Sequence, residues 1–298
     1  MEFSNRSKSY IDNCKAIVQN SFTILLQFFV TYIKTINLKM KKLTYLVVLL
    51  FSLATYAQQS IVNVTFHDVP REKMDEFLTL HKKFHDVSIS DESTVTGGGI
   101  FAHKYAGNYS VATYAFYNSE SDLEKDTAAA AAARTAYWNS LSDDEKQVVG
   151  PQWGNYNKMA VYNHYDEIRI SNENSLFWEA ENLDWSTNKI MVVSKYNVKW
   201  GMNQDFNAGL QQNLKNYQDS GIPVAVYSNR HLYGAGYSFN IYIFYDSWSD
   251  FAAFEEGNFQ PMNETSKKFW ASVADHEDEI LVMLGGIDPE TKEINYIK

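Results

Sequence analysis

The chain contains one segment twice. Residues 103–123 read HKYAGNYSVATYAFYNSESDL and residues 231–251 read HLYGAGYSFNIYIFYDSWSDF, so ten of 21 positions are identical at a shift of 128 residues. A repeat of this size predicts two copies of one small fold that pack together. Each copy is then an internal control for the other, because the shared fold does not explain a position where the copies differ in polarity or volume.

The N-terminal 57 residues are expected to be removed from the mature protein. Met40-Lys41-Lys42 is a short basic region, residues 43–53 are mostly apolar, and Ala54–Ala57 is typical of a signal-peptidase site. We therefore predict that residues 1–39 are an extension from a misassigned start codon and that residues 40–57 are a signal peptide. The mature protein would be exported, to the periplasm or the extracellular space. The alternative is a membrane hairpin with residues 22–36 as one arm, although both apolar runs are short for a membrane span.

Composition narrows the chemistry and the partners. The sole cysteine, Cys14, lies in the segment expected to be removed, so residues 58–298 hold no disulfide, thiolate metal site or cysteine nucleophile. The first 57 residues carry seven of the 26 Lys and Arg and two of the 36 Asp and Glu, which leaves a net charge of about −15 on the rest. Such a surface repels nucleic acid and anionic lipid, so we exclude nucleic acid and membranes as partners of the mature chain. A homo-oligomer remains open.

Each half of the mature chain predicts the order β-α-β-β-α-β, the ferredoxin-like unit. Alternating polarity marks strands, and apolar side chains at helical spacing mark helices. In the first half, 58–166, Gly97–Gly99 is expected to break the chain before a hairpin. The expected elements of this half are strands 61–66, 100–105, 109–118 and 158–165, a helix from Pro70, and a helix capped by Ser119 or Ser121.

The second half, 189–298, follows a polar linker, 167–188. It repeats the order of the first half, with a first helix that ends at Gly221. The expected elements are strands 189–196, 224–233, 237–245 and either 280–284 or 293–297, and helices 203–219 and from Ser247 or Ser249.

Two such units in tandem resemble the dimeric α+β barrel superfamily. Its members include antibiotic-biosynthesis-type monooxygenases, haem-degrading monooxygenases, chlorite-dismutase-like haem proteins and the NIPSNAP group. The resemblance covers nearly all of 58–298 and rests on element order and repetition, not on a diagnostic motif. It implies an α+β fold in which two tandem ferredoxin-like units form an intramolecular α+β barrel covered by helices. In the enzyme members, ligands usually lie between the helices and the sheet of one unit.

The two halves differ on the faces that the helices are expected to cover. The first half is the more polar, because it carries polar side chains where its twin carries apolar ones. An unpaired polar group is costly to bury, so these side chains need a partner, a ligand or solvent. It is also smaller along one strand, and its second helix carries six consecutive alanines, Ala128–Ala133. The aligned pairs are Asn63/Val192, His67/Tyr196, His81/Leu210, His85/Leu214, Val111/Phe239, Thr113/Ile241 and Ala115/Ile243.

We therefore predict a pocket between the helices and the sheet of the first half, which takes a small apolar or aromatic ligand, while the second half is a filled scaffold. The alternative is structural: the two helix histidines lie at the edge of the buried stripe, Phe84 points inward instead of the second histidine, and the alanines mark a close helix–sheet contact. The predicted ligand-binding residues are Asn63, His67, His81, His85 and Thr113.

Residues common to both halves are expected to be structural. His103 and His231 occupy equivalent positions, which predicts a role in the hairpins or between the halves. The repeated tyrosines are predicted to be core and interface aromatics; they are the pairs Tyr105/Tyr233, Tyr109/Tyr237 and Tyr114/Tyr242.

Three functions remain open at this stage. The first is an exported small-molecule-binding protein, for which catalysis is not assured. The second is a cofactor-free or haem-dependent monooxygenase or isomerase that uses an imidazole as base or axial ligand. The third is a structural or interaction module without a ligand. His81 and His85, with His67, could present nitrogens to a metal, but the glutamate of a zinc-hydrolase helix is missing, so no metal site is predicted. The cofactor stays unknown, with haem as one candidate.

Overall fold

The computed structural model describes residues 60–297 except 161, 163, 173 and 258–260. The chain divides into residues 1–56 and residues 57–298, and the fold below is that of the second unit. The predicted N-terminal extension and signal peptide lie outside the described residues. Among the helices that are described, none has the length and apolar character needed to cross a bilayer.

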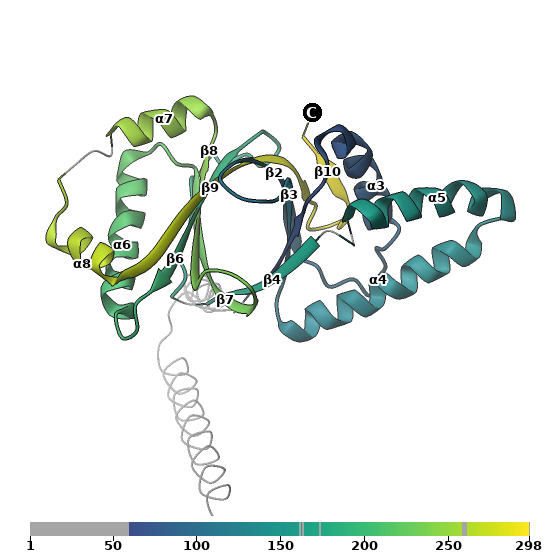
Figure 1. Cartoon of the computed structure of the whole chain (residues 1–298), viewed down its shortest axis with the longest axis horizontal. Helices are drawn as coiled ribbons and strands as arrows, with labels where there is room; N and C mark the ends of the chain where they lie inside the picture. Colours follow the sequence, from purple (N-terminus) through teal and green to yellow (C-terminus); the bar gives the residue numbers. More distant parts are fainter. Residues whose placement is uncertain (1–59, 161, 163, 173, 258–260, 298) are drawn as a thin grey trace, which may run out of the picture. The chain divides into compact units, whose positions relative to one another are not determined.

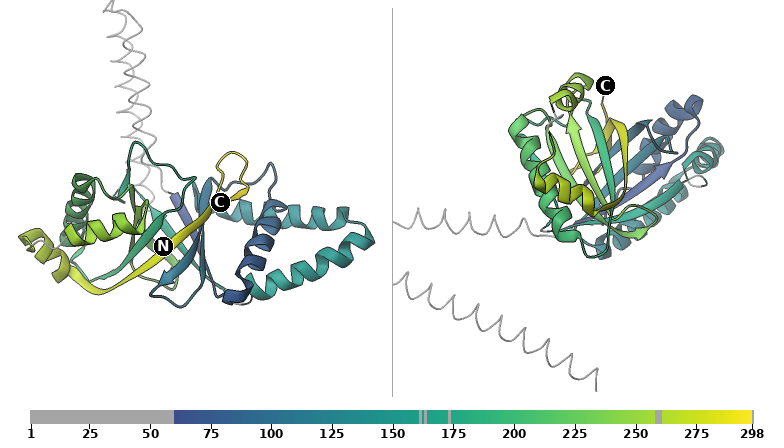
Figure 2. Two further views of the ribbon diagram at one scale, coloured as in Figure 1. Left: turned by 90° about the horizontal axis from the view of Figure 1, so that it is seen from above. Right: turned by 60° about the vertical axis from the view of Figure 1, so that its left-hand side comes forward.

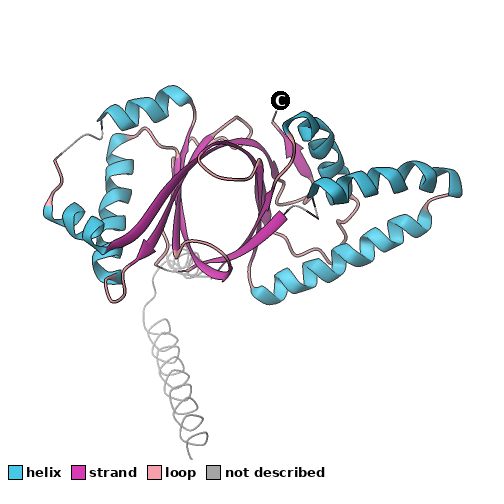
Figure 3. Ribbon diagram, in the orientation of Figure 1, coloured by secondary structure: helices cyan, strands magenta, loops and turns pink. Residues whose placement is uncertain are grey.

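A closed antiparallel β-barrel forms the centre of this unit (Figure 3). The strands are β1 Ser60–His67, β2 Gly97–Tyr105, β3 Val111–Tyr117, β4 His164–Ser171, β5 Phe177–Glu179, β6 Ile190–Val198, β7 Ala225–Gly234, β8 Phe239–Tyr245, β9 Val273–Ile287 and β10 Ile294–Tyr296. Eight of them follow one another around the ring in the order β9-β2-β3-β1-β4-β7-β8-β6, and pairing of β6 with β9 closes it. The short β5 and β10 add to β7 and β9.

Helices lie outside the barrel on two opposite sides (Figures 1 and 2). They are the 3-10 turn η2 Arg71–Lys73, α3 Met74–Asp86, α4 Glu120–Ser140, α5 Asp143–Ala160, α6 Asn203–Ser220, α7 Trp248–Gly257 and α8 Glu264–Ser272. α3, α4 and α5 lie on one side, and α6, α7 and α8 on the other. α4 and α5 form a long hairpin that extends away from the barrel, and Ala129 is the buried residue of α4. On the other side α7 and α8 are shorter than α4 and α5, and α8 packs against α6.

The strand directions bring equivalent parts of the two halves to the same end of the barrel. All neighbouring strands in the ring are antiparallel, so β1 and β6 run in the same direction. The ends of β1 and β6, the β2–β3 and β7–β8 hairpins, and the starts of β4 and β9 therefore share one end. We call it the hairpin end.

Side chains alternate between the barrel interior and the helices. On β1, Val62, Val64 and Phe66 point into the barrel, where they join a core with strand residues of both halves. Asn63 and His67 point to the opposite face, towards α3–α5. Separate helix–sheet cores lie on each side, one around Phe77 and Phe84 of α3 and the other around Phe206 of α6.

The barrel interior also holds a buried ion pair. Arg169 on β4 is 0% exposed, and its Nη1 donates to Glu167 on the same strand at 2.9 Å. Its Nε donates to Asn229 Oδ1 at 2.5 Å and its Nη2 to the carbonyl of Tyr237 at 3.0 Å. Each nitrogen of this guanidinium therefore donates to an acceptor, either on its own strand or in the second half of the chain.

The predicted boundaries hold for most elements, with two corrections. Gly97–Gly99 does not break the chain but lies inside β2. A side chain at Gly98 would place its Cβ 2.1 Å from the carbonyl oxygen of Tyr114, so glycine serves the close approach of two strands. The predicted strand 158–165 is wrong because Lys158–Ala160 ends α5 and β4 begins at His164. The predicted linker 167–188 thus begins inside β4 and contains β5.

Helices α6 and α8 approach so closely that only glycine fits at one position. A Cβ on Gly209 would lie 2.5 Å from Phe269 Cβ, whereas one on Gly154 of α5 meets nothing within 4 Å. Gly209→Ala should lower the free energy of unfolding by about 1–3 kcal/mol through overpacking. The matched control Gly154→Ala should raise it by about 0.5–1 kcal/mol through helix propensity. Urea denaturation of both variants tests this, and equal shifts would contradict the close contact.

Candidate functional site

Four of the five predicted ligand residues lie on the outer face of the first half, and three of them, His67, His81 and Thr113, lie near one another. Asn63 and His67 are on β1, and Thr113 is on the neighbouring β3, opposite Thr65 in the register. His81 comes from α3, which covers this face, and its ring centroid lies 6.1 Å from that of His67. The sheet and one helix thus place His67, His81 and Thr113 together, whereas Asn63 lies about 13 Å further along β1.

His67 is a buried, neutral imidazole. It is 5% exposed, its Nδ1–H donates to the carbonyl of Ala160 at 3.1 Å, and Phe77 packs against the ring. A carbonyl only accepts, so the proton lies on Nδ1 and Nε2 is an acceptor, 3.5 Å from the hydroxyl oxygen of Thr113. The pKa of His67 is lowered to about 4, chiefly by burial and also by nearby His164, against the hydrogen bond to Ala160 and the charge of Asp166, which raise it.

His81 is also neutral at pH 7. Its ring stacks on Phe77 at 5.3 Å, and its Nδ1 forms a hydrogen bond of 2.9 Å with the hydroxyl of Tyr156 on α5. Burial lowers the pKa of His81 to about 3, with smaller contributions from His67 and His85. The site therefore presents uncharged hydrogen-bonding groups among aromatic rings.

His85 is not part of this group. Its Nε2–H donates to the carbonyl of Lys292 at 2.8 Å, in the turn before β10. The inward residue of this helical turn is Phe84, which is 2% exposed and packs edge-on against Trp153 at 4.3 Å. The structure thus shows the structural alternative: Phe84, and not His85, lies on the buried apolar stripe of α3.

The histidines form a row and not a cluster. Successive ring centroids of His164, His67, His81 and His85 are separated by 6.3, 6.1 and 6.5 Å, so the nitrogens do not converge on one point. Within the described residues, no group of three His, Cys, Asp or Glu side chains is placed to hold a metal ion.

The residues on this face do not fit a haem. An axial histidine needs one ring nitrogen facing a flat, open slot. Both the His67 and the His81 ring pack on Phe77, at 5.3 Å each, and Thr113 lies against Nε2 of His67. A haem macrocycle would have to displace these contacts.

At three aligned strand positions the outer face of the first half is the more accessible one, whereas at a fourth pair Val111 is 0% exposed and Phe239 is partly exposed. The twin positions Val192, Ile241 and Ile243 are 8%, 2% and 4% exposed, in the packed core under α6. In the first half, Asn63, Thr113 and Ala115 all stay partly exposed. The difference follows from α4, which has little buried surface and extends outward with α5.

The repeated residues have the expected structural roles only in part. His103 and His231 each bond through Nε2 to a carbonyl in their own hairpin turn, Ala106 at 2.6 Å and Gly234 at 2.9 Å, which agrees with a role in the hairpins. Tyr109, Tyr114 and Tyr242 are buried core aromatics. Tyr105 and Tyr233 are not core residues, since they are 63% and 55% exposed, but the Tyr105 ring meets Trp248 of the second half edge-on at 6.1 Å.

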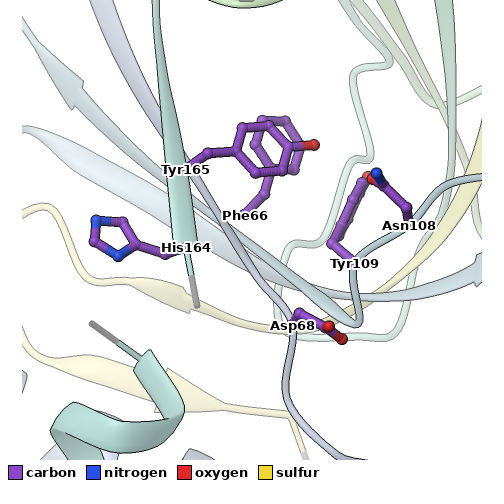
Figure 4. Close-up of a pocket in the computed structure, with 6 residues that line it drawn as sticks. All are labelled: Phe66, Asp68, Asn108, Tyr109, His164 and Tyr165. Atoms are coloured by element: carbon purple, nitrogen blue, oxygen red, sulfur yellow. The ribbon is translucent and has the colours of Figure 1, made fainter. Parts of the chain in front are cut away.

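A pocket that the sequence did not indicate lies at the hairpin end (Figure 4). It has a volume of about 290 Å³ and opens to solvent. Tyr165 and His164 point to opposite sides of β4, so the pocket reaches from the barrel interior to the rim. Its lining residues are Phe66, Asp68, Asn108, Tyr109, His164 and Tyr165.

Comparisons with known proteins identify the fold. No protein-family model matches the sequence, and no curated protein matches it either. An anthrone oxidase-like protein superimposes with a TM-score of 0.51 at 15% identity, over 77% of this chain and 92% of that protein. An inferred monooxygenase from Lactobacillus acidophilus NCFM has a TM-score of 0.49 at 12% identity, over 76% and 94% of the two chains. A chlorite dismutase variant from Candidatus Nitrospira defluvii has 0.47 at 8%, over 76% and 91%.

The class that emerges is the closed α+β barrel, as expected from the resemblance to the dimeric α+β barrel superfamily. At these identities the likeness concerns the fold alone, and the chemistry must be argued from the side chains of this chain.

Proposed function

We propose that this chain is a tandem duplication of a ferredoxin-like unit that binds a small, uncharged aromatic molecule on the outer face of its first half. The site comprises Asn63, His67, His81 and Thr113, with Tyr156 on the helix side. The observation that carries the proposal is the contrast between the halves: this face is polar and partly open where its twin is apolar and filled.

The chemistry of the site favours a neutral ligand. His67 and His81 are uncharged at pH 7, so they do not attract an anion, and Phe77 and Tyr156 add aromatic surface next to them. The amide of Asn63 both donates and accepts hydrogen bonds. A phenol or a related hydroxylated ring would satisfy such a set.

Binding is preferred over catalysis because of the basicity of the imidazoles. An efficient general base has a pKa near the working pH. With pKa values lowered to about 4 and about 3, His67 and His81 are weak bases at neutral pH. We also propose that the mature protein is exported, which N-terminal sequencing of the natively purified chain tests: it should begin at Gln58.

Filling the site with the twin's residue should weaken binding. Thr113→Ile introduces the side chain found at Ile241, so it should raise the dissociation constant for the probe 2-naphthol at least about tenfold, since volume rather than charge is changed. His81→Leu should weaken binding about fivefold by removing a hydrogen-bonding group. Fluorescence titration provides the measurement.

The matched control for this experiment is Thr135→Ile, on the exposed surface of α4. It should bind 2-naphthol as the unmodified chain does. The anion 2-naphthoate should bind more weakly than 2-naphthol throughout. Equal affinities for all four proteins, or no binding by the unmodified chain, would contradict the proposed function.

A further inference from the structure

The pocket at the hairpin end is walled by aromatic rings. Phe66 and Tyr165 are opposite each other in the register of β1 and β4, and their rings stack at 4.6 Å with an interplanar angle of 18°. Tyr109 meets Phe66 edge-on at 4.7 Å. Phe66 and Tyr109 are 3% and 5% exposed, whereas Tyr165 is 41% exposed and presents its ring to the opening (Figure 4).

Carboxylates surround these rings. Asp68 stands exposed at the rim, next to the end of β1, and Tyr109 donates to Glu279 at 2.5 Å. Burial raises the pKa of Tyr165, and the nearby carboxylates Glu167, Glu279 and Glu277 raise it further. The cations of the interior are already paired, Arg169 with Glu167 and Lys195 with Glu279. These pairs offset the charges of Glu167 and Glu279, so among the described residues Asp68 and Glu277 are the nearby carboxylates without an ion pair, and their charge favours a cation over an anion.

The second half shows how this end of the barrel accommodates an ammonium group. The strand registers pair Val64 with Glu167 and Val193 with Glu279, so Phe66 corresponds to Lys195 and Tyr165 to Glu277. Lys195 Nζ lies 2.5 Å from Glu279 and 6.0 Å from the centre of the Phe66 ring. An alkylammonium of the chain thus already rests between a carboxylate and an aromatic ring.

At the position equivalent to Lys195 the first half has no cation. The ammonium near Phe66 is that of Lys195, which is paired with Glu279, and no described residue forms an ion pair with Asp68. In place of the lysine and glutamate of its twin the first half has the Phe66–Tyr165 stack, and Asp68 stands where the second half has Asn197. Aromatic faces next to a carboxylate are the recognition set for alkylated ammonium groups. We propose that this pocket binds a small organic cation of the alkylammonium or quaternary ammonium class. The site is separate from the one on the outer face and does not depend on it.

The test uses choline as the probe and its uncharged isostere 3,3-dimethylbutan-1-ol as the reference. At constant ionic strength, calorimetric titration of residues 58–298 should show saturable choline binding, at least about tenfold tighter than the isostere. Asp68→Asn should weaken choline binding about threefold to tenfold by removing the rim charge. Tyr165→Ala should weaken it about fivefold or more by removing the exposed ring.

Two control variants show whether these effects are local. Asp75→Asn removes an exposed carboxylate on α3, and Phe177→Ala removes a ring that is 63% exposed on β5. Both should bind choline normally. The exposed position of Asp68 makes its variant safe for folding, so this variant decides the matter if Tyr165→Ala is unstable. Equal binding of choline and its isostere, an unchanged affinity in Asp68→Asn, or absence of saturable choline binding would overturn the proposal.

Discussion

Replacing Arg169 with methionine should lower the free energy of unfolding by about 3–5 kcal/mol. The guanidinium is 0% exposed and has three acceptors in the barrel: the Glu167 carboxylate, the Asn229 amide and the carbonyl of Tyr237. Without it, Glu167, which is 7% exposed, becomes an uncompensated charge in the interior. Chemical denaturation at pH 7 measures the loss.

Two further variants separate the buried charge from the volume change. The double variant Glu167→Gln/Arg169→Met removes both charges and should recover much of the lost stability. Lys215→Met breaks an exposed pair with Asp219, which has the short distance of 2.8 Å but side chains that are 65% and 63% exposed. It should change stability by less than about 1 kcal/mol. A loss in Arg169→Met as small as in Lys215→Met would show that the interior pair is hydrated.

Acid should destabilise the fold through His67 and His81. Their pKa values are lowered to about 4 and about 3, whereas an unfolded histidine titrates near about 6.5. The unfolded chain therefore takes up more protons as the pH falls below 6.5, and the native state is disfavoured. Each histidine should reduce the free energy of unfolding by up to about 1.4 kcal/mol per pH unit, until the pH reaches its folded pKa.

The comparison of variants isolates this effect from the carboxylates, which titrate in the same range. Urea denaturation between pH 7 and 4.5 should give a shallower slope of stability against pH for His81→Leu than for the unmodified chain. Thr135→Ile, on the exposed surface of α4, neither adds nor removes a titratable group and should leave the slope unchanged. Parallel slopes for all three proteins would mean that the two imidazoles are accessible to protons in the native state.

The architecture could be predicted because the periodicity of apolar residues and the internal repeat are both visible in the sequence. The repeat around Tyr114 and Tyr242 located the equivalent central strands, which pair with β1 and β6 in matching registers. Alignment of Phe77 with Phe206 located the buried stripes of α3 and α6, and both side chains are 0% exposed. Comparison of the halves then singled out His67, His81 and Thr113, which lie near one another in the structure, because equivalent backbone positions carry different chemistry.

Other features of the structure could not be predicted from the residue types at single sequence positions. Helix α5 was not predicted, although Ser142 and Glu145 form a capping box at its start, with the Ser142 backbone N–H donating to the Glu145 carboxylate at 2.7 Å. Pro151 lies inside this helix, and a proline normally predicts that a helix ends or kinks. The pocket at the hairpin end depends on strand register, which brings Phe66 next to Tyr165 from 99 residues away. The inward turn of Phe84 instead of His85 depends on helix phase to within one residue.

The central claim is that the sheet face of the first half is open to small molecules while the equivalent face of the second half is closed. Residues 58–298 contain no cysteine, so single cysteines at twin positions report on each face separately. Ala115→Cys and Ile243→Cys in this chain differ only in the half that they probe.

The decisive measurement is the rate at which a small thiol reagent labels each variant under native conditions, relative to its rate in denaturant. The cysteine at position 115 should react at least about tenfold faster than the one at position 243, because the latter is exposed only by local unfolding. The ligand probe 2-naphthol should slow the reaction at position 115 alone. Equal labelling rates at the two positions would contradict the account, since both faces would then be equally closed or equally open.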